Sequence, residues 1–201
     1  MLAPMRPFLV AVLGYLLGSL PIANLVAGRR AAIDLRTRGD RNPGYWNAKA
    51  TLGRRAALPV FAGDVAKGAA AAGVGALMMH GSQGGNWWLP WLGGLAAMIG
   101  HAWPVFARFR GGRSVLCFVG TMLVAAPLAA VVALAICGAV WAVTRRFDWA
   151  ARVGVFGFPF VEAMFDPLTR VAATGVLMTF IGIRFGMAAL ADRRDPGHAV
   201  G

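Results

Sequence analysis

The sequence predicts an all-α protein: a polytopic membrane helical bundle of about seven transmembrane helices, with the N-terminus outside and the C-terminus cytoplasmic. Of its 201 residues, 58% are hydrophobic and 14% are charged, whereas a soluble domain usually carries about a quarter charged residues. One core of this size cannot bury so many apolar groups, so lipid is the expected solvent for most of the chain. The segments are apolar on all faces, which argues against a membrane barrel of alternating strands.

Apolar segments of about 20 residues, the length that crosses a bilayer, divide the chain. The expected spans are residues 7–26, 56–79, 89–106, two helices within 114–144, 153–165 and 168–190. Residues 114–144 as one straight helix would be about 46 Å long, so we expect a turn near Ala126 and Pro127; one long tilted helix is the alternative. Residues 1–192 form a single membrane domain, and residues 193–201 are expected to be a disordered cytoplasmic tail.

The charge distribution supports this topology. The chain has 20 Lys and Arg against 8 Asp and Glu, a net charge of +12, which in a soluble protein would indicate nucleic-acid binding. In a membrane protein, the cytoplasmic loops carry the positive excess. Seven spans place sixteen basic residues inside and only Arg6 and Arg170 outside. The expected partner is therefore the lipid bilayer and not nucleic acid.

Two features predict close packing between helices. Glycines at a spacing of four, which let helix backbones approach, occur at Gly14 and Gly18 and again at Gly182 and Gly186. Asp64 and Lys67 lie one turn apart inside an apolar span, where they can pair on one helix face. Because charge is costly in a membrane, this pair either fixes helix packing or belongs to a functional site.

Three polar segments are predicted at the cytoplasmic face: residues 34–51, 100–114 and 144–152. Each mixes Arg or Lys with Gly or Asn. Backbone N–H groups next to guanidinium groups suit a phosphate. The double glycine at Gly111 and Gly112 leads directly into a helix and is typical of an anion site at a helix N-terminus. The alternative is that these charges only set the topology.

Four motifs follow one another in the chain. They are Gly14-Tyr-Leu-Leu-Gly-Ser-Leu-Pro21, then Asp34-Leu-Arg36 with Gly39, Asn42, Gly44 and Asn47, then Asp64-x-x-Lys67-Gly68, and then Gly100-His-Ala-Trp-Pro-Val-Phe-Ala-Arg-Phe-Arg-Gly-Gly-Arg113. In this order they resemble the bacterial acyl-phosphate:glycerol-3-phosphate acyltransferases, the PlsY family, over roughly residues 10–150.

The resemblance implies seven transmembrane helices in the bacterial plasma (inner) membrane, with the active site at the cytoplasmic face. It implies transfer of an acyl chain from acyl phosphate to glycerol 3-phosphate, or to another polar acceptor, without a metal or other cofactor. Candidates for catalysis are Asn47 and His101. By resemblance, the residues that bind substrate phosphate are Arg36, Asn42, Lys49, Gly111, Gly112, Arg113 and Arg145.

The chain also departs from the family pattern. The departures are Asp40 and Asp148 in place of serines, Trp46 in place of a threonine, Ala50 in place of a basic residue, Arg113 in place of lysine and Ser114 in place of glycine. A last family motif with His and Asn has no clear counterpart, although Arg184 lies in that region. These departures leave two alternatives: a catalytically silent relative that acts as a lipid-binding or partner-binding subunit, or an acyltransferase with a neutral or cationic acceptor.

Overall fold

The computed structural model describes residues 3–79 and 85–194, and these residues form helices and connecting turns without a strand. The α-helices are α1 (Arg6–Gly18), α2 (Ile22–Ala31), α3 (Tyr45–Leu52), α4 (Arg54–Met79), α5 (Leu89–Ala102), α6 (Val115–Ala125), α7 (Pro127–Thr144), α8 (Phe147–Phe156), α9 (Phe158–Glu162) and α10 (Leu168–Arg194). Three short 3-10 helices are η1 (Ala3–Met5), η2 (Leu35–Thr37) and η3 (Val105–Ala107).

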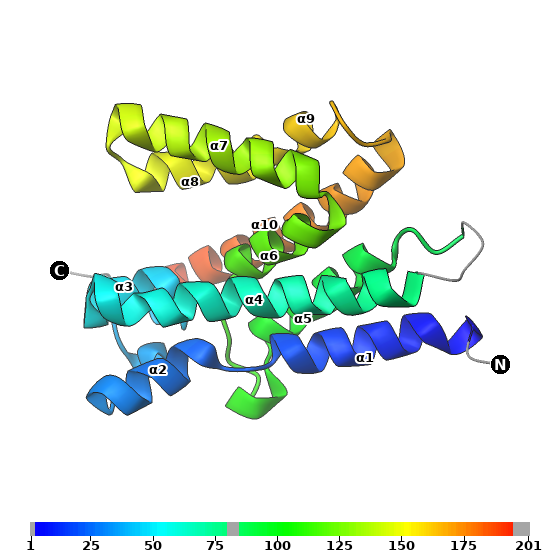
Figure 1. Ribbon diagram of the computed structural model, residues 1–201. Helices are drawn as coiled ribbons and strands as arrows, with labels where there is room; N and C mark the ends of the chain where they lie inside the picture. Colours follow the sequence, from blue (N-terminus) through cyan, green and yellow to red (C-terminus); the bar gives the residue numbers. More distant parts are fainter. Residues whose placement is uncertain (1–2, 80–84, 195–201) are drawn as a thin grey trace.

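The long helix α4 lies at the centre of the bundle. It packs against α1, α5 and α6, while α7 and α8 form a separate antiparallel-looking pair that reaches the rest of the bundle through α6 and α9 (Figure 1). The start of α1 and the end of α10 lie at opposite ends of the bundle (Figure 1). This arrangement fits an odd number of crossings, whereas the assignment of the cytoplasmic side stays a prediction.

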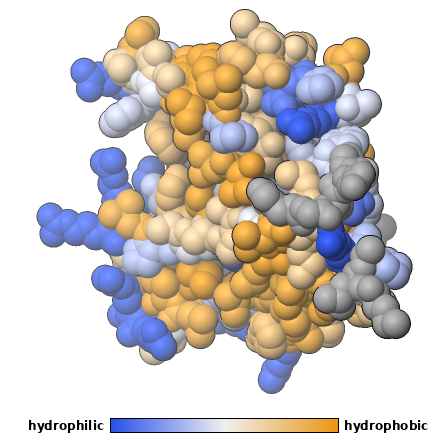
Figure 2. All heavy atoms as spheres, turned by 45° about the vertical axis from the view of Figure 1, so that its right-hand side comes forward, coloured by the Kyte–Doolittle hydropathy of each residue, from blue (hydrophilic) through white to orange (hydrophobic). Residues whose placement is uncertain are grey.

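Several helices have the length and composition of membrane spans. They are Arg6–Ala31, taken as one stretch, Arg54–Met79, Pro127–Thr144 and Leu168–Ala191, with Val115–Ala125 as a shorter apolar helix. Many large apolar side chains point outward, among them Phe160 and Leu168. Figure 2 shows hydrophobic side chains covering the middle of one face, with hydrophilic side chains projecting beyond its left edge. The surface is therefore suited to lipid.

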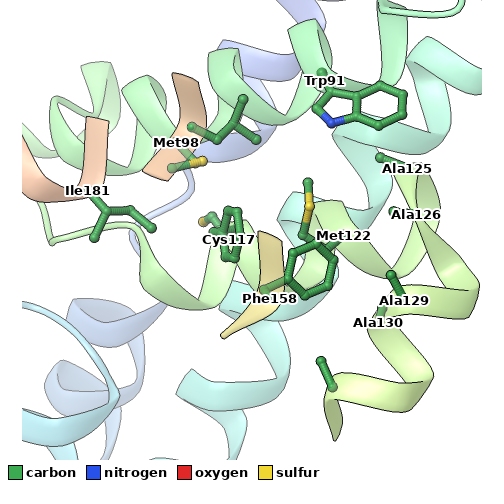
Figure 3. Close-up of a cluster of buried hydrophobic side chains, with 13 residues drawn as sticks. Trp91, Met98, Cys117, Met122, Ala125, Ala126, Ala129, Ala130, Phe158 and Ile181 are labelled. Carbon is green, nitrogen blue, oxygen red and sulfur yellow. The ribbon is translucent and has the colours of Figure 1, made fainter. Parts of the chain in front are cut away.

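The largest group of buried apolar side chains lies where α5, α6, α7, α9 and α10 meet (Figure 3). Phe118 and Phe158 stack edge to face, with ring centroids 5.8 Å apart. The Trp91 Nε1–H group donates a hydrogen bond to Thr174 Oγ1 at 3.0 Å, so the indole enters the core without an unpaired donor. In lipid, packing of this kind replaces the hydrophobic effect as the main force between helices.

Glycine provides the closest helix contacts, as predicted for one of the two pairs. A Cβ atom at Gly18 would overlap the backbone of Ala97 in α5, and one at Gly14 would press on Gly93 in the same helix. The expectation for Gly182 and Gly186 is wrong, because both glycines of α10 face open space with nothing within 4 Å of an added Cβ. The spacing of small residues marks a possible contact, but the face that a helix turns to its neighbours decides whether it is used.

The turn expected near Pro127 is confirmed: α6 ends at Ala125 and α7 begins at Pro127, so residues 114–144 form two helices. Pro127 stands at the first position of α7, where its missing N–H group costs nothing. The last helix continues through Arg194, past the expected end of the membrane domain at residue 192. The rest of the predicted tail lies outside the described residues.

Several element boundaries differ from the sequence prediction. The expected span 153–165 is divided at Gly157 between the end of α8 and the short helix α9. The expected span 7–26 is broken at Ser19–Pro21, because proline cannot continue the hydrogen-bond ladder. The expected span 89–106 ends at Ala102, since Pro104 keeps the residue before it out of the helical conformation. The polar segments also contain helices that were not predicted: α3 lies within residues 34–51, and α8 begins at Phe147, six residues before the expected span.

Candidate active site

The polar segment between α2 and α4 is held in shape by the buried side chain of Asn47. Its Nδ2 amide donates to the carbonyl oxygens of Leu35 at 2.9 Å and Arg38 at 2.8 Å, and its Oδ1 accepts from Thr51 Oγ1 at 3.1 Å. All of these bonds stay within the segment, and Gly39, with φ +55°, passes directly over the amide. Asn47 therefore shapes the segment rather than lining a cavity.

Arg36 joins this segment to the turn that follows α5. Its Nε donates to both carboxylate oxygens of Asp34 at 2.9 Å, and its Nη1 donates to the Ala107 carbonyl oxygen at 2.9 Å. The hydrogen bonds from Arg36 lower the pKa of Asp34 below its ordinary value, so this carboxylate is charged at neutral pH. Arg36, predicted to bind phosphate, is thus occupied within the protein.

Gly111 and Gly112 fold back onto the last turn of α5. The Gly111 N–H donates to the Ala102 carbonyl oxygen at 3.1 Å, and the Gly112 N–H donates to the His101 carbonyl oxygen at 3.0 Å. A Cβ at Gly111 would overlap the His101 carbonyl, and one at Gly112 would overlap the His101 ring at Nε2. The glycines therefore allow close approach to His101, and their N–H groups are not free for phosphate as the sequence suggested.

A buried polar cluster connects α4, α5 and the break between α1 and α2. Lys67 Nζ lies 2.9 Å from Asp64 Oδ1 and donates to the Leu20 carbonyl oxygen at 3.1 Å. His101 Nδ1 lies 3.5 Å from the same Asp64 oxygen. Each of the three side chains is less than a tenth exposed. The predicted pair of Asp64 and Lys67 is confirmed, and His101 joins it to form what we call the buried triad (Asp64, Lys67 and His101).

A cavity rich in arginine opens next to the triad, between residues 40–42, the double glycine and α10. Its empty volume is about 750 Å³, including space open to solvent. We call it the arginine cavity; its lining residues are Asp40, Arg41, Asn42, Gly111, Arg113, Arg184, Ala188 and Ala191. Arg113 stacks on the Phe185 ring, with Cζ 5.0 Å from its centroid, and Arg184 stacks on Trp103 at 4.7 Å. This cavity is suited to an anion.

A second cavity lies between α6, α7 and α8 and is lined mainly by apolar side chains, among them Phe118, Met122 and Leu134. Its empty volume is about 1160 Å³, open space included. We call it the apolar cavity. Its polar end contains four side chains from the site, namely Asn42, Asp64, His101 and Arg113. Asn42 and Arg113 also line the arginine cavity, so the two cavities meet at these residues.

A third, smaller cavity lies on the other side of the triad. Its empty volume is about 270 Å³, and its polar lining includes Lys67, His101, Arg110 and Gly112. His101 and Asp64 therefore belong to both the small cavity and the apolar cavity. The imidazole of His101 thus borders the apolar cavity and the small polar cavity, while the arginine cavity meets the apolar cavity at Asn42 and Arg113.

The structure brings together only part of the predicted set. Asn42, His101 and Arg113 gather at the junction with Gly111 and Gly112, and the triad adds Asp64 and Lys67. Lys49 instead lies over the Trp46 ring, 5.2 Å from its centroid, and Ala50 is exposed. Trp46 borders the apolar cavity and contacts Phe147 of α8, with ring centroids 5.6 Å apart.

The two residues predicted from the last polar segment lie away from the junction. Arg145 is exposed after α7, with φ +56°, and Asp148 lies in α8 with its carboxylate 4.0 Å from Arg146. Neither borders any of the three cavities described above. Asp40, by contrast, lines the arginine cavity. The two aspartates that stand in place of family serines, Asp40 and Asp148, therefore have different surroundings.

Arg41 is a site residue that the sequence did not assign, and Arg184 was noted only as lying in the region of the missing last family motif. Arg184 Nη2 donates to the Gly112 carbonyl oxygen at 3.3 Å, and its Nε is buried without a hydrogen-bond partner among the described residues. An arginine inside an apolar span is a signal of function, and this could have identified Arg184. Arg41 lies in a run of basic residues, where nothing distinguishes it from charges that set the topology.

Comparisons with known proteins agree with this architecture. A curated relative from Dehalococcoides mccartyi, glycerol-3-phosphate acyltransferase 5, is 36% identical over 157 residues, which cover 78% of this chain and 65% of the relative. The glycerol-3-phosphate acyltransferase of Thermoanaerobacter pseudethanolicus is 33% identical over 179 residues, which cover 89% of this chain and 87% of the relative.

Crystal structures of PlsY (YgiH), an integral membrane glycerol 3-phosphate acyltransferase, are also similar. The glycerol 3-phosphate form has a TM-score of 0.74 and 26% identity and covers 97% of this chain and 96% of that one; the lysophosphatidic acid form has a TM-score of 0.72 and 25% identity and covers 94% and 93%. Residues 8–190 match the family described as glycerol-3-phosphate acyltransferase. The chain therefore belongs to the glycerol-3-phosphate acyltransferase family of integral membrane enzymes.

Proposed function

We propose that this chain transfers an acyl chain from acyl phosphate to the 1-hydroxyl of glycerol 3-phosphate at the cytoplasmic face of a bacterial inner membrane. The products are lysophosphatidic acid and inorganic phosphate. One observation carries the proposal: the apolar cavity and the arginine cavity meet at Asn42 and Arg113, next to His101. An apolar cavity that meets a cavity lined by guanidinium groups matches a reaction between an acyl chain and an anionic acceptor.

The site residues divide the reaction between them. The acyl chain lies in the apolar cavity with its carbonyl carbon near His101, and glycerol 3-phosphate places its phosphate in the arginine cavity. The hydroxyl oxygen forms a bond to the carbonyl carbon, the bond from that carbon to the phosphate oxygen breaks, and His101 takes the hydroxyl proton. Asp64 orients the imidazole, as a carboxylate does for a general base. The phosphate group leaves as inorganic phosphate, close to the small cavity that Lys67 and Arg110 border.

The purified protein in phospholipid vesicles tests this reaction. Incubation with acyl phosphate and glycerol 3-phosphate is expected to give lysophosphatidic acid, measured by lipid mass spectrometry, and one equivalent of inorganic phosphate. Acyl-CoA and acyl carrier protein thioesters are the donor controls, and glycerol is the acceptor control. No product from acyl phosphate, beside an active family member, would favour the catalytically silent subunit instead. Product from glycerol alone would favour a neutral acceptor.

Replacement of Arg184 by alanine is expected to raise the KM for glycerol 3-phosphate about tenfold and to change kcat little. The half-buried guanidinium has an unpaired Nε donor and borders the arginine cavity, and a hydrogen bond from a charged donor to phosphate contributes about 1.5–3 kcal/mol. Initial rates against acceptor concentration measure the effect. Arg29→Ala, which removes an exposed charge on α2, is the matched control and should leave the KM unchanged; an equal effect of both variants would contradict the assignment.

A further inference from the structure

The arginine cavity contains a carboxylate that the proposed reaction does not use. Asp40 Oδ2 lies 3.3 Å from Arg113 Nη1, and Asp40 Oδ1 accepts a hydrogen bond from the Asn42 backbone N–H at 3.2 Å. The Asp40 carboxylate thus contacts the guanidinium of Arg113, which lines both the arginine cavity and the apolar cavity. An anion that binds Arg113 in the arginine cavity is therefore repelled by the Asp40 carboxylate.

The pair is built so that it can open. The Asp40 side chain is 40% exposed. Asp40 precedes Arg113 by 73 residues in the chain, and the two side chains share one contact at the long end of the hydrogen-bond range. Exposed ion pairs of this kind contribute little, about 0–1 kcal/mol. Arg113 does not depend on Asp40 for its position, because its guanidinium also lies over the Phe185 ring. Opening the pair therefore leaves Arg113 in place.

The carboxylate also has a use when the cavity is empty. Arg113 and Arg184 border one cavity, and two like charges on the same cavity repel each other. A negative charge from the protein offsets part of this repulsion until a ligand replaces it. A phosphate dianion carries twice the charge of the carboxylate and can bind a guanidinium through two oxygens, so it can take over Arg113.

We propose that Asp40 is a built-in counter-ion that the phosphate of the acceptor must displace from Arg113, and that it thereby sets the KM and the charge selectivity of acceptor binding. The proposal rests on the proposed function, since it takes the arginine cavity to be the acceptor site. It makes Asp40 a specificity-determining residue: acceptors with a dianionic phosphate displace the carboxylate, whereas acceptors with one negative charge or none compete poorly for Arg113.

Asp40→Asn tests the proposal, because asparagine keeps the shape and the hydrogen bond to the Asn42 N–H but removes the charge. The KM for glycerol 3-phosphate is expected to fall by up to about fivefold, the factor that corresponds to about 1 kcal/mol, with kcat and the KM for acyl phosphate changed less than twofold. The inhibition constant of inorganic phosphate, competing with the acceptor, should fall by a similar factor. Asp148→Asn is the matched control: it removes a carboxylate that borders none of the cavities and should change none of these constants.

The Arg113→Ala background separates displacement from charge at a distance. Without the guanidinium there is nothing for carboxylate and phosphate to compete over, so Asp40→Asn should lower the acceptor KM by less than twofold there. An undiminished gain in that background would overturn the proposal, as would an acceptor KM that rises or stays the same in Asp40→Asn alone. An inactive unmodified protein would instead overturn the proposed function, so the two failures are distinguishable.

Discussion

Replacement of His101 by alanine is expected to lower kcat by a factor of about 10² to 10⁴, the range that general acid–base catalysis contributes. His101 is the described imidazole that borders both the apolar cavity and the small polar cavity, and its Nδ1 faces Asp64 at 3.5 Å. Removing the ring takes away the group that accepts the hydroxyl proton. Single-turnover formation of lysophosphatidic acid in vesicles, measured across pH, gives the rate of the chemical step.

Because His101 is buried against Gly112, a loss of activity could also follow from a disturbed fold. His101→Gln, which keeps a polar side chain of similar reach, serves as the second variant, and thermal unfolding in detergent compares both proteins with the parent. A folded His101→Gln protein with an unchanged chemical step would contradict the role of the imidazole as a base. Asp64→Asn removes the group that orients the ring and also leaves the buried Lys67 ammonium without its ion-pair partner, so it should unfold at a lower temperature than the parent as well as lose activity.

Replacement of Gly18 by alanine is expected to destabilise the bundle by about 3 kcal/mol, at the upper end of what overpacking costs. An added Cβ would overlap the backbone of Ala97, and backbone on both sides leaves no side chain that could turn away. The two helices α1 and α5 would have to separate along their shared contact. Loss of the folded fraction on heating, or in a series of increasingly denaturing detergent mixtures, measures the effect.

Gly182→Ala is the matched control for this prediction. Gly182 lies inside the apolar helix α10, whereas Gly18 is the last residue of α1, and an added Cβ at Gly182 has nothing within 4 Å. Alanine is a better helix former than glycine by up to about 1 kcal/mol, so Gly182→Ala should leave stability unchanged or raise it slightly. Equal losses in the two variants would show that the close approach of α1 and α5 is not what makes Gly18 sensitive.

The sequence predicts the ends of the helices well where a proline or a change from polar to apolar residues marks them. Pro127 divides α6 from α7 as expected, and α4 begins within two residues of the predicted start and ends at Met79. The break at Ser19–Pro21 was not predicted, although Pro21 is visible in the sequence, because the apolar run continues through it. The faces that helices turn to one another depend on the whole bundle, which is why Gly14 and Gly182 could not be told apart.

The sequence predicted many of the residues in the candidate site, but not the contacts that each of them makes. The motif around His101 and Arg113 locates the junction of the cavities, and the pair of Asp64 and Lys67 follows from their spacing of three. The roles of Asn47 and Arg36 could not be predicted, because their partners include backbone carbonyl oxygens, such as those of Leu35 and Ala107, whose position is fixed only by the fold. A sequence shows which side chains can bind an anion but not which are already occupied.

The break between α1 and α2 ties the first helices to a part of the chain that is synthesised later. The Leu20 carbonyl oxygen accepts one hydrogen bond locally, from the Ile22 N–H at 3.0 Å, and a second from Lys67 Nζ, 47 residues further along, at 3.1 Å. The first bond shapes the turn, and the second fastens it to α4. Loss of the Lys67 ammonium would therefore leave the turn itself intact but release α1 and α2 from their fixed position against α4.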